Sequence, residues 1–208
     1  MVEKKSILCG LDEAGRGPLA GPVCAAAVIL PDDFPFYILD DSKILKPAER
    51  EFAKIAISQK AIAWGIGWAS AAEIDEINIH NATLLAMKRA FCSMEAMLTS
   101  PGKTSDEPSF NSNEGLALKN IRAVADGLFV PDIPVPCEAL VKADSKVPAV
   151  MAASILAKTA RDRLMEHYSI FYPEYGYEKH KGYPTKAHRE AIRRHGPSPI
   201  QRMSFRVT

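Results

Sequence analysis

Four acidic residues occupy places in this sequence where carboxylates are costly. Asp12 and Glu13 are adjacent within the apolar stretch 6–15. Asp126 closes a second apolar stretch in "VADG", and Asp144 closes a third in "KADS". Since strand ends within one sheet lie close together, the four acids could converge on one edge of a sheet. Crowded carboxylates raise each other's pKa and destabilise a fold unless a cation neutralises them.

A convergent set of oxygen ligands without His or Cys favours Mg²⁺ or Mn²⁺ over zinc. Two such ions about 4 Å apart can activate a water and stabilise the leaving oxygen of a phosphodiester. Each acid also has a simpler explanation. Asp126 and Gly127 could form a plain turn, and Asp144 could cap a helix that begins near Val147. Only the joint pattern favours a divalent-metal site.

The stretch "GRGPLAG", residues 15–21, follows the acid pair directly. Its glycines would let the backbone approach a phosphate closely, and the Arg16 guanidinium would add a fork of donors. A tight connection between two strands would explain the glycines equally well. A Walker phosphate loop is excluded because GxxxxGK[ST] is absent, and no helix start follows, so a dinucleotide-binding fingerprint is excluded too.

Apolar runs predict the elements that would carry these residues. Two nearly continuous runs, 6–15 and 21–31, predict two central strands joined by a tight connection. A helix is expected at 46–59 and a third strand at 61–70. A long helix over roughly 71–98 follows, because Ser70 and Glu73 have the spacing of a capping box.

The second half of the chain completes one mixed α/β domain. Residues 99–115 are rich in Ser, Pro, Gly and Asn and predict a surface loop, to which we assign no chemistry. Two further strands are expected at 121–127 and 137–145, then a helix over 147–168. A basic loop, a short helix and a tail follow. A chain of 208 residues is long enough for a substantial core.

The net charge of +1 hides an asymmetry along the chain. Residues 1–138 carry 13 Lys and Arg against 19 Asp and Glu, whereas residues 139–208 carry 13 against 6. An acidic body with a basic end suits a polyanion held against a metal site. An accident of surface charge would give the same counts.

The four cysteines form no CxxC pair and lie among apolar or small residues. We interpret them as reduced thiols of the core. The first apolar stretch breaks at Asp12, too early for a signal peptide, and no apolar run approaches membrane-spanning length. We therefore expect a cytoplasmic enzyme or binding protein.

Seven motifs in the chain, taken together, resemble the bacterial ribonuclease HII family, the type 2 ribonucleases H. In chain order they are "DEAGRGPLAGPVCAAAVIL", "DDSKIL", "EIDEINIHNAT", "ADG", "VKADSKVPAVMAASILAKTARD", "YGYEKHKGYPTKAH" and "RMSF". The resemblance runs from about residue 7 to 206, and the first and fifth motifs are too long for coincidence.

The resemblance implies an α/β, ribonuclease H-like fold: a mixed five-stranded sheet flanked by helices, with a small helical C-terminal part. It implies one catalytic domain, 1–208, of which about 166–208 is a basic substrate-binding part. It further implies an endonuclease that cuts the RNA strand of RNA–DNA hybrids and incises DNA 5′ of embedded ribonucleotides. The implied cofactor is Mn²⁺ or Mg²⁺, and the products would carry 5′-phosphate and 3′-hydroxyl ends. No obligatory protein partner is expected.

The motifs also imply roles for individual residues. Asp12 and Glu13 match the leading acid pair of the family, Asp126 its third acid and Asp144 its fourth, all of them catalytic metal ligands.

The substrate-binding motifs supply the remaining roles. The family's Gly-Arg-Gly motif, which reads the 2′-OH of the ribonucleotide and the neighbouring phosphates, matches Gly15, Arg16 and Gly17. Its Asp-Ser-Lys motif, which contacts a backbone phosphate, matches Ser42 and Lys43.

Tyr183 matches the tyrosine that packs at the junction between ribo- and deoxyribonucleotide. Without the resemblance, a packing role for this aromatic residue would be favoured. Ile44 stands where the family often has a second lysine, so one phosphate contact is missing.

Two other classes of function stay open at this point. A structure-selective DNA nuclease or a strand-transfer enzyme also uses clustered acids on a related sheet, but would not need to recognise a 2′-OH. A non-catalytic module that binds hybrids would not need the full set of acids. Cleavage of an all-DNA duplex would indicate the first class, and metal-dependent turnover would exclude the second.

Overall fold

The computed structural model describes residues 6–40, 42, 44–99 and 118–207. Its centre is a five-stranded sheet in the order β3-β2-β1-β4-β5. The strands are β1 (Ile7–Ala14), β2 (Val23–Ile29), β3 (Ala63–Ala69), β4 (Ile121–Asp126) and β5 (Cys137–Leu140). β1 pairs antiparallel with β2 and β2 antiparallel with β3, whereas β1–β4 and β4–β5 are parallel. The sheet is therefore mixed, as the sequence predicted.

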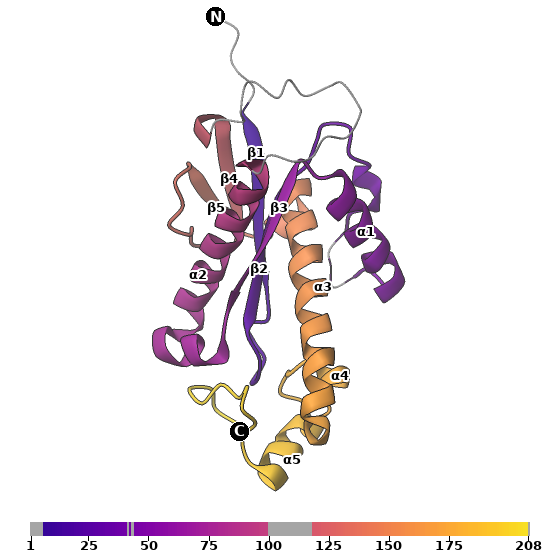
Figure 1. The fold of residues 1–208 in the computed structure, drawn as a ribbon, viewed down its shortest axis with the longest axis vertical. Helices are drawn as coiled ribbons and strands as arrows, with labels where there is room; N and C mark the ends of the chain where they lie inside the picture. Colours follow the sequence, from indigo (N-terminus) through magenta and orange to yellow (C-terminus); the bar gives the residue numbers. More distant parts are fainter. Residues whose placement is uncertain (1–5, 41, 43, 100–117, 208) are drawn as a thin grey trace, which may run out of the picture.

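Helices cover both faces of this sheet (Figure 1). Helix α2 (Ala71–Thr99) packs on one face, and α1 (Pro47–Lys60) and α3 (Pro148–Phe171) pack on the other. After α3 the chain forms the short helix α4 (Tyr177–His180) and then α5 (Lys186–His195). Both lie beside the C-terminal end of α3, away from α1.

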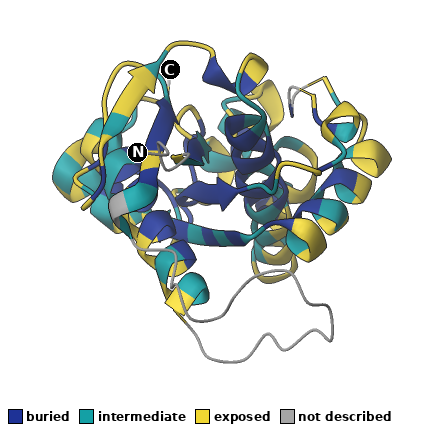
Figure 2. Cartoon of the chain, turned by 90° about the horizontal axis from the view of Figure 1, so that it is seen from above, coloured by how far each residue is buried: buried dark blue, intermediate teal, exposed yellow. Residues whose placement is uncertain are grey.

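Alternation along the strands divides the core into two layers. Cys9 and Leu11 of β1 belong to the cluster under α2, whereas Cys24 and Ala26 of β2 belong to the cluster under α1 and α3. All seven residues of β2 are buried because both faces of this strand are covered. Figure 2 shows buried strands at the centre and exposed residues on the outer sides of the helices.

Gly10 lets α3 approach β1 closely. A Cβ at this position would lie 2.1 Å from the backbone carbon of Ala149, in the first turn of α3. Only glycine leaves room for that approach. The start of α3 is consequently held against the strand that carries Asp12 and Glu13.

Beyond shifts of one or two residues at the ends of other elements, three elements differ from the sequence-based expectation. The strand expected at 137–145 ends at Leu140. The helix expected from 147 begins at Pro148 and runs on to Phe171. The long helix expected at 71–98 is broken at Asn78, which has φ 66° and ψ 164°. The Asn78 side chain accepts hydrogen bonds from the backbone N–H groups of His80 and Asn81, so it caps the helical part that follows.

Other expectations have mixed outcomes. The Ser70–Glu73 capping box is confirmed by reciprocal hydrogen bonds of 2.8 and 3.2 Å. All four cysteines are free, but Cys92 is exposed, so the expectation that all of them lie in the core was wrong for this residue. Most of the loop expected at 99–115 lies outside the described residues. None of the described helices is long and apolar enough to cross a bilayer.

Candidate active site

Two neighbouring parallel strands bring three of the four acids to one region of the sheet. Leu11 of β1 is paired with Ala125 of β4, so the next residues along the two strands are Asp12 and Asp126. Asp126 is the last residue of β4. Asp12 is buried, with 4% of its surface exposed, and Glu13 follows it on the same strand. The parallel register is what places these carboxylates near one another.

Asp144 reaches this region from a turn and not from a strand end, which corrects the sequence-based expectation. It lies in the 3₁₀ turn η3 (Ala143–Ser145), beyond the end of β5, and is buried. The carboxylate of Asp126 accepts a 2.7 Å hydrogen bond from the backbone N–H of Ala143. Asp126 therefore fixes the turn that carries Asp144.

Asp144 does not cap helix α3, which was the alternative role considered for it. Helix α3 has Val147 as its N-cap residue, and no side chain caps it.

Burial and the charges of neighbouring acids raise the pKa values of Asp12 and Glu13. The pKa of Asp12 is raised well above its usual value, first by burial and then by the charges of Glu13 and Asp126, against a hydrogen bond from Ser154. Burial also raises the pKa of Glu13, which the Arg16 guanidinium partly offsets. Arg16 Nη1 lies 3.7 Å from Glu13 Oε1. The protein itself supplies little compensation for the charge of Asp12.

The donor set suits a hard divalent cation. All four candidate ligands are carboxylates, and a nearby cation would relieve the repulsion that raises the pKa of Asp12 and Glu13. Across the described residues, however, no three His, Cys, Asp or Glu side chains are already gathered as metal ligands. The four acids fit such an ion by chemistry and neighbourhood, and they would have to turn toward it on binding.

A buried pair of hydroxyls connects Ser42 to the acids. Ser42 Oγ lies 2.8 Å from Ser154 Oγ of α3, and Ser154 hydrogen-bonds to Asp12. Ser42 is thus tied to the acid pair through α3. Lys43, its partner in the predicted phosphate-binding motif, lies outside the described residues, and Ile44 is 70% exposed.

The loop after β1 is held from inside by Arg202. The guanidinium of this fully buried residue donates to the carbonyl oxygens of Gly15 (2.6 Å), Arg16 (3.0 Å) and Gly21 (2.8 Å). Burial and the nearby charge of Arg161 lower the pKa of Arg202 to about 9, which leaves it charged at neutral pH. Arg202 thereby fixes the orientation of the Gly-Arg-Gly backbone.

Arg161 of α3 holds the other side of the same loop. Its guanidinium donates to the carbonyl oxygens of Ala20, Pro22 and Lys181 at distances between 2.9 and 3.2 Å. Gly15 has φ +99°, and a Cβ there would lie 1.9 Å from Arg161 Nε. Both the backbone conformation and the space therefore require glycine at position 15.

Tyr183 lies against the Gly-Arg-Gly loop. A Cβ on Gly17 would lie 3.6 Å from Tyr183 Cε1. The backbone N–H of Leu19 donates to the carbonyl of Gly182 at 2.8 Å, and the guanidinium of Arg161 lies 6.0 Å from the Tyr183 ring centroid. Tyr183 is 41% exposed. The structure therefore brings the Gly-Arg-Gly residues and Tyr183 together, although they are far apart in the sequence.

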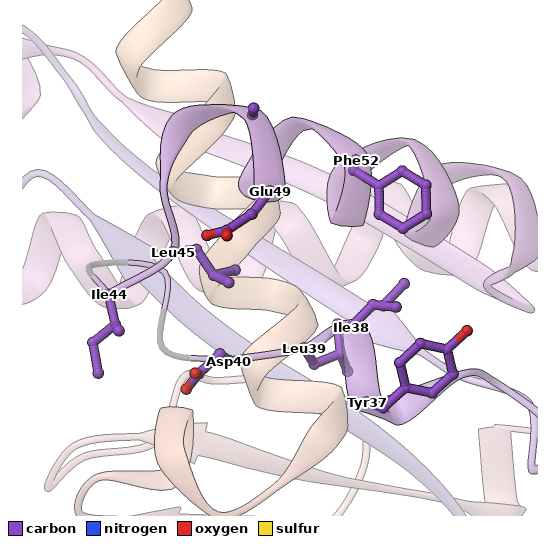
Figure 3. A pocket seen from close by; sticks show the side chains of 9 residues that line it. Tyr37, Ile38, Leu39, Asp40, Ile44, Leu45, Glu49 and Phe52 are labelled. Atoms are coloured by element: carbon purple, nitrogen blue, oxygen red, sulfur yellow. The ribbon is translucent and has the colours of Figure 1, made fainter.

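A groove of about 590 Å³ lies between the 37–40 segment and α1 (Figure 3). Apolar side chains such as Ile38, Leu45 and Phe52 line it, together with Asp40 and Glu49. An apolar lining with acidic groups is a poor match for a phosphate backbone. None of the four candidate acids lines this groove.

Comparison with known proteins shows the family. The family model for ribonuclease HII matches residues 9–208. The chain belongs to the ribonuclease HII family. It is 55% identical to the ribonuclease HII of Treponema denticola over 97% of this chain and 98% of that protein. It is 43% identical to that of Desulforamulus reducens over 95% of this chain and 88% of the relative.

Membership makes the chain an endonuclease of the hydrolase class. Ribonuclease HII has ribonuclease H activity on RNA–DNA hybrids, and the ribonucleases H use divalent metals.

Solved structures confirm the ribonuclease H-like fold. Ribonuclease HII of Archaeoglobus fulgidus, determined in complex with PCNA, superposes with a TM-score of 0.70 at 24% identity, over 97% of this chain and 96% of that one. Bst ribonuclease HIII in complex with Mn²⁺ superposes with a TM-score of 0.68 at 18% identity, over 98% of this chain and 68% of that one.

Three residues of this ribonuclease HII site were missed from the sequence. Arg161, Arg202 and Ser154 received no role, although each lies within a motif that carried the resemblance. A signal existed for Arg161, which is spaced four residues from the buried Ala157 and Met165 of α3 and so falls on its apolar stripe. Arg202 has no comparable local signal, because the carbonyls it binds belong to the loop after β1.

Proposed function

We propose that this ribonuclease HII cuts on the 5′ side of ribonucleotides, both in hybrids and as single residues embedded in DNA. The cut leaves 5′-phosphate and 3′-hydroxyl ends. The observation that supports this most is a continuous series of neighbouring residues that runs from the acids through the Gly-Arg-Gly loop to Tyr183. Glu13 faces Arg16, and Gly17 lies against the Tyr183 ring, so a sugar recognised at the loop would have its phosphate near the carboxylates.

Asp12, Glu13, Asp126 and Asp144 would hold divalent metal. Bound metal would supply an activated water and positive charge at the leaving oxygen of the phosphodiester. Asp12 is buried and Glu13 partly buried, and burial together with the charge of a neighbouring acid raises the pKa of each, so both are prepared to accept a cation. Asp126 has a second task, because its hydrogen bond to Ala143 holds the turn that carries Asp144.

The Gly-Arg-Gly loop is suited to recognise the 2′-OH with its backbone. None of the described peptide bonds is cis, and in a trans peptide the C=O and the following N–H point in opposite directions. Because the Gly15 and Arg16 carbonyls bind Arg202, the N–H groups of Arg16 and Gly17 point away from that buried guanidinium. Those two donors could serve a 2′-OH and an adjacent phosphate.

Tyr183 would discriminate the sugar on the 3′ side of the ribonucleotide, at the junction with the following deoxyribonucleotide. Its half-exposed ring offers a flat face that tolerates a deoxyribose and packs poorly on a ribose. Arg16, whose side chain is 51% exposed, would reach a phosphate from the other side of the loop.

Further phosphate contacts would come from two regions. Ser42 and Lys43 would bind one backbone phosphate near the acids. The basic part at about 166–208 would bind the duplex more broadly, since α5 carries exposed Arg193 and Arg194 in its last turn.

Three matched duplexes test the proposal: all-DNA, DNA with one ribonucleotide, and RNA–DNA hybrid, each with Mg²⁺ and with Mn²⁺. We expect cleavage of the second and third, 5′ of the ribonucleotide, and none of the first. Cleavage of the all-DNA duplex would indicate a structure-selective DNA nuclease instead. Cleavage confined to the hybrid would contradict the activity on embedded ribonucleotides.

Tyr183→Ala and Tyr183→Phe test the discriminating role. Tyr183→Ala should slow cleavage of the single-ribonucleotide duplex by about ten-fold or more, because correct placement of the reacting group is lost. Tyr183→Phe should retain most of the rate if the ring and not the hydroxyl matters. Parental rates for Tyr183→Ala on that duplex would reduce Tyr183 to a packing residue.

A further inference from the structure

Two histidines stack on each other and contact the backbone of Gly182 and Tyr183, which we call the Tyr183 segment. The rings of His180, the last residue of α4, and His188 of α5 have centroids 4.5 Å apart and planes inclined by 18°. The edge of each meets the Tyr177 ring, at 5.9 Å for His180 and 5.4 Å for His188. His188 is fully buried. None of the motif roles described above uses this pair.

Three hydrogen bonds connect the histidine pair to the Tyr183 segment. His188 Nδ1 lies 3.0 Å from the carbonyl oxygen of Tyr183. The backbone N–H of Gly182 donates to His180 Nδ1 at 3.2 Å. The backbone N–H of Tyr183 donates to the carbonyl of His180 at 2.8 Å. The backbone on both sides of the Tyr183 Cα is thus tied to the stacked pair.

These contacts assign one neutral tautomer to each ring. A carbonyl only accepts, so His188 Nδ1 must carry the proton, and its buried Nε2, which has no partner, carries a lone pair. His180 Nδ1 accepts from Gly182, so its proton is on Nε2, which donates to the carbonyl of Tyr175 at 2.8 Å. As neutral groups, both rings satisfy the backbone groups that they contact, and only His188 Nε2 is left without a partner.

We propose that His180 and His188 are positioning residues that hold Tyr183 against the Gly-Arg-Gly loop for the discrimination of ribonucleotide junctions. The segment is clamped from two sides. Arg161 and Leu19 bind the carbonyls of Lys181 and Gly182 from the side of that loop, and the histidine pair binds the other side. The proposal rests on the proposed function of Tyr183.

A charge on the pair would release the segment. A proton on His180 Nδ1 would remove the acceptor for the Gly182 N–H, and a proton on His188 Nε2 would be a buried donor without a partner. Burial is the largest cause that lowers the pKa of both rings. The titratable and charged groups that face the pair are Tyr175, Tyr177, Glu178, Lys181 and Tyr183. Both histidines are therefore neutral at pH 7. The Tyr183 segment is released only when the pH falls below 6.5, the ordinary pKa of histidine.

Two substitutions at one position separate positioning from packing. The amide nitrogen of His188→Asn occupies the place of Nδ1 and can donate to the Tyr183 carbonyl, whereas His188→Gln places its amide near Nε2. Both are neutral and remove the ring stack. On the single-ribonucleotide duplex we expect His188→Gln to lose about ten-fold in kcat/KM, with His188→Asn close to the parent. Equal rates for the two variants would overturn the proposal.

A second comparison distinguishes this proposal from the role of Tyr183 itself. In a Tyr183→Ala background, His188→Gln should cause no further loss of cleavage, because the side chain it positions is gone. A full additional loss would overturn the proposal. If Tyr183→Ala alone cleaves at the parental rate, the proposed function of Tyr183 fails, and amide hydrogen exchange at Gly182 and Tyr183 then decides the positioning. Faster exchange in His188→Gln than in His188→Asn supports it, and equal protection contradicts it.

The acid response gives an independent readout. Between about pH 7.5 and about pH 5, exchange at the Gly182 amide, corrected for its chemical rate, should accelerate in the parent protein. In His180→Asn the side-chain oxygen can accept the same hydrogen bond at every pH, so protection should persist. Unchanged protection in the parent, or the same acceleration in His180→Asn, would contradict a neutral histidine clamp.

Discussion

Asp12 and Arg202 are both buried charged side chains, and their surroundings differ in kind. Asp12 lies among other acids, and its pKa is raised because little in the chain neutralises it. Arg202 is surrounded by three carbonyl oxygens that its guanidinium satisfies. A buried charge that hydrogen bonds within the protein compensate helps to hold the fold together. A buried charge that the protein does not compensate can instead bind an external ion. This difference supports the proposed metal-binding role of the acids, whereas Arg202 holds the loop after β1 in place.

The largest effect is expected when a carboxylate is neutralised. Asp12→Asn or Asp126→Asn should reduce turnover by more than about 100-fold, the range seen for changes merely behind a metal ligand. Duplex binding should largely survive. Steady-state cleavage with Mg²⁺ and with Mn²⁺ measures the loss. Asp132→Asn is the matched control, since Asp132 is an exposed acid paired with Lys88. Near-parental turnover in either site variant would remove the acids from the mechanism.

Loss of the buried Arg202 guanidinium should mainly reduce the stability of the fold. Arg202→Met leaves three carbonyls without a donor, so unfolding should become easier by about 3 kcal/mol or more. Chemical denaturation measures this change, and Arg206→Met, at an exposed arginine nearby, should be almost neutral. A stable Arg202→Met protein with parental activity would mean that the loop keeps its shape without the guanidinium.

The same acid substitution that stops turnover should stabilise the metal-free protein. The Asp12→Asn amide keeps an oxygen acceptor and removes the repulsion from Glu13 and Asp126. The melting temperature should rise by roughly 2–4 °C, which about 1 kcal/mol produces in a chain of this size. Stabilisation by added Mn²⁺ should shrink.

The pH dependence of this gain has a definite sign. The pKa of Asp12 is raised in the folded state, so ionisation costs stability as the pH rises above the ordinary value of 3.8. The gain in Asp12→Asn should therefore be largest at neutral pH and fade toward pH 4. A lower melting temperature for the variant at neutral pH would show that the acids do not repel each other.

The smallest effect is expected for a single exposed cation. Arg194→Gln, in the basic last turn of α5, should reduce the slope of log affinity against log salt by about one unit. Lys88→Gln on α2, outside the basic C-terminal part, is the control and should leave the slope unchanged. Filter binding with a catalytically inactive Asp12→Asn protein gives the slope. Affinity that does not respond to salt would exclude a phosphate-binding role for this region.

The sequence predicted the sheet and its acids because both have local signatures. Apolar runs define β1, β2 and β4, and the acids interrupt or end those runs. The break at Asn78 was missed because the apolar period continues across it while one side chain caps the next turn. The 3₁₀ turn of Asp144 was assigned to a strand, since a turn held by the distant Asp126 side chain has no local pattern.

The contacts that hold the loops could not be predicted for a related reason. Arg202 binds main-chain carbonyls. Because every residue carries such a carbonyl, the sequence does not show which of them accept a hydrogen bond from a distant side chain. The glycines of this loop were expected to let the backbone approach a phosphate or to form a tight connection, but the space left by Gly15 is filled by Arg161 of α3. Only the resemblance to a family connected Tyr183 with the Gly-Arg-Gly loop.

The distance in sequence between Gly15 and Arg202 has a consequence during synthesis. The two residues that meet are separated by 187 positions, and Gly21 likewise hydrogen-bonds to the carbonyl of Ile200. At about 5–20 residues per second, the ribosome needs on the order of 10–40 s to deliver the arginine after the glycine has emerged. In the last part of that interval, after Asp144 has been made, a nascent chain already carries all four acids and still lacks the arginine that fixes the loop after β1. Translation itself thereby delays the moment at which a nuclease becomes competent.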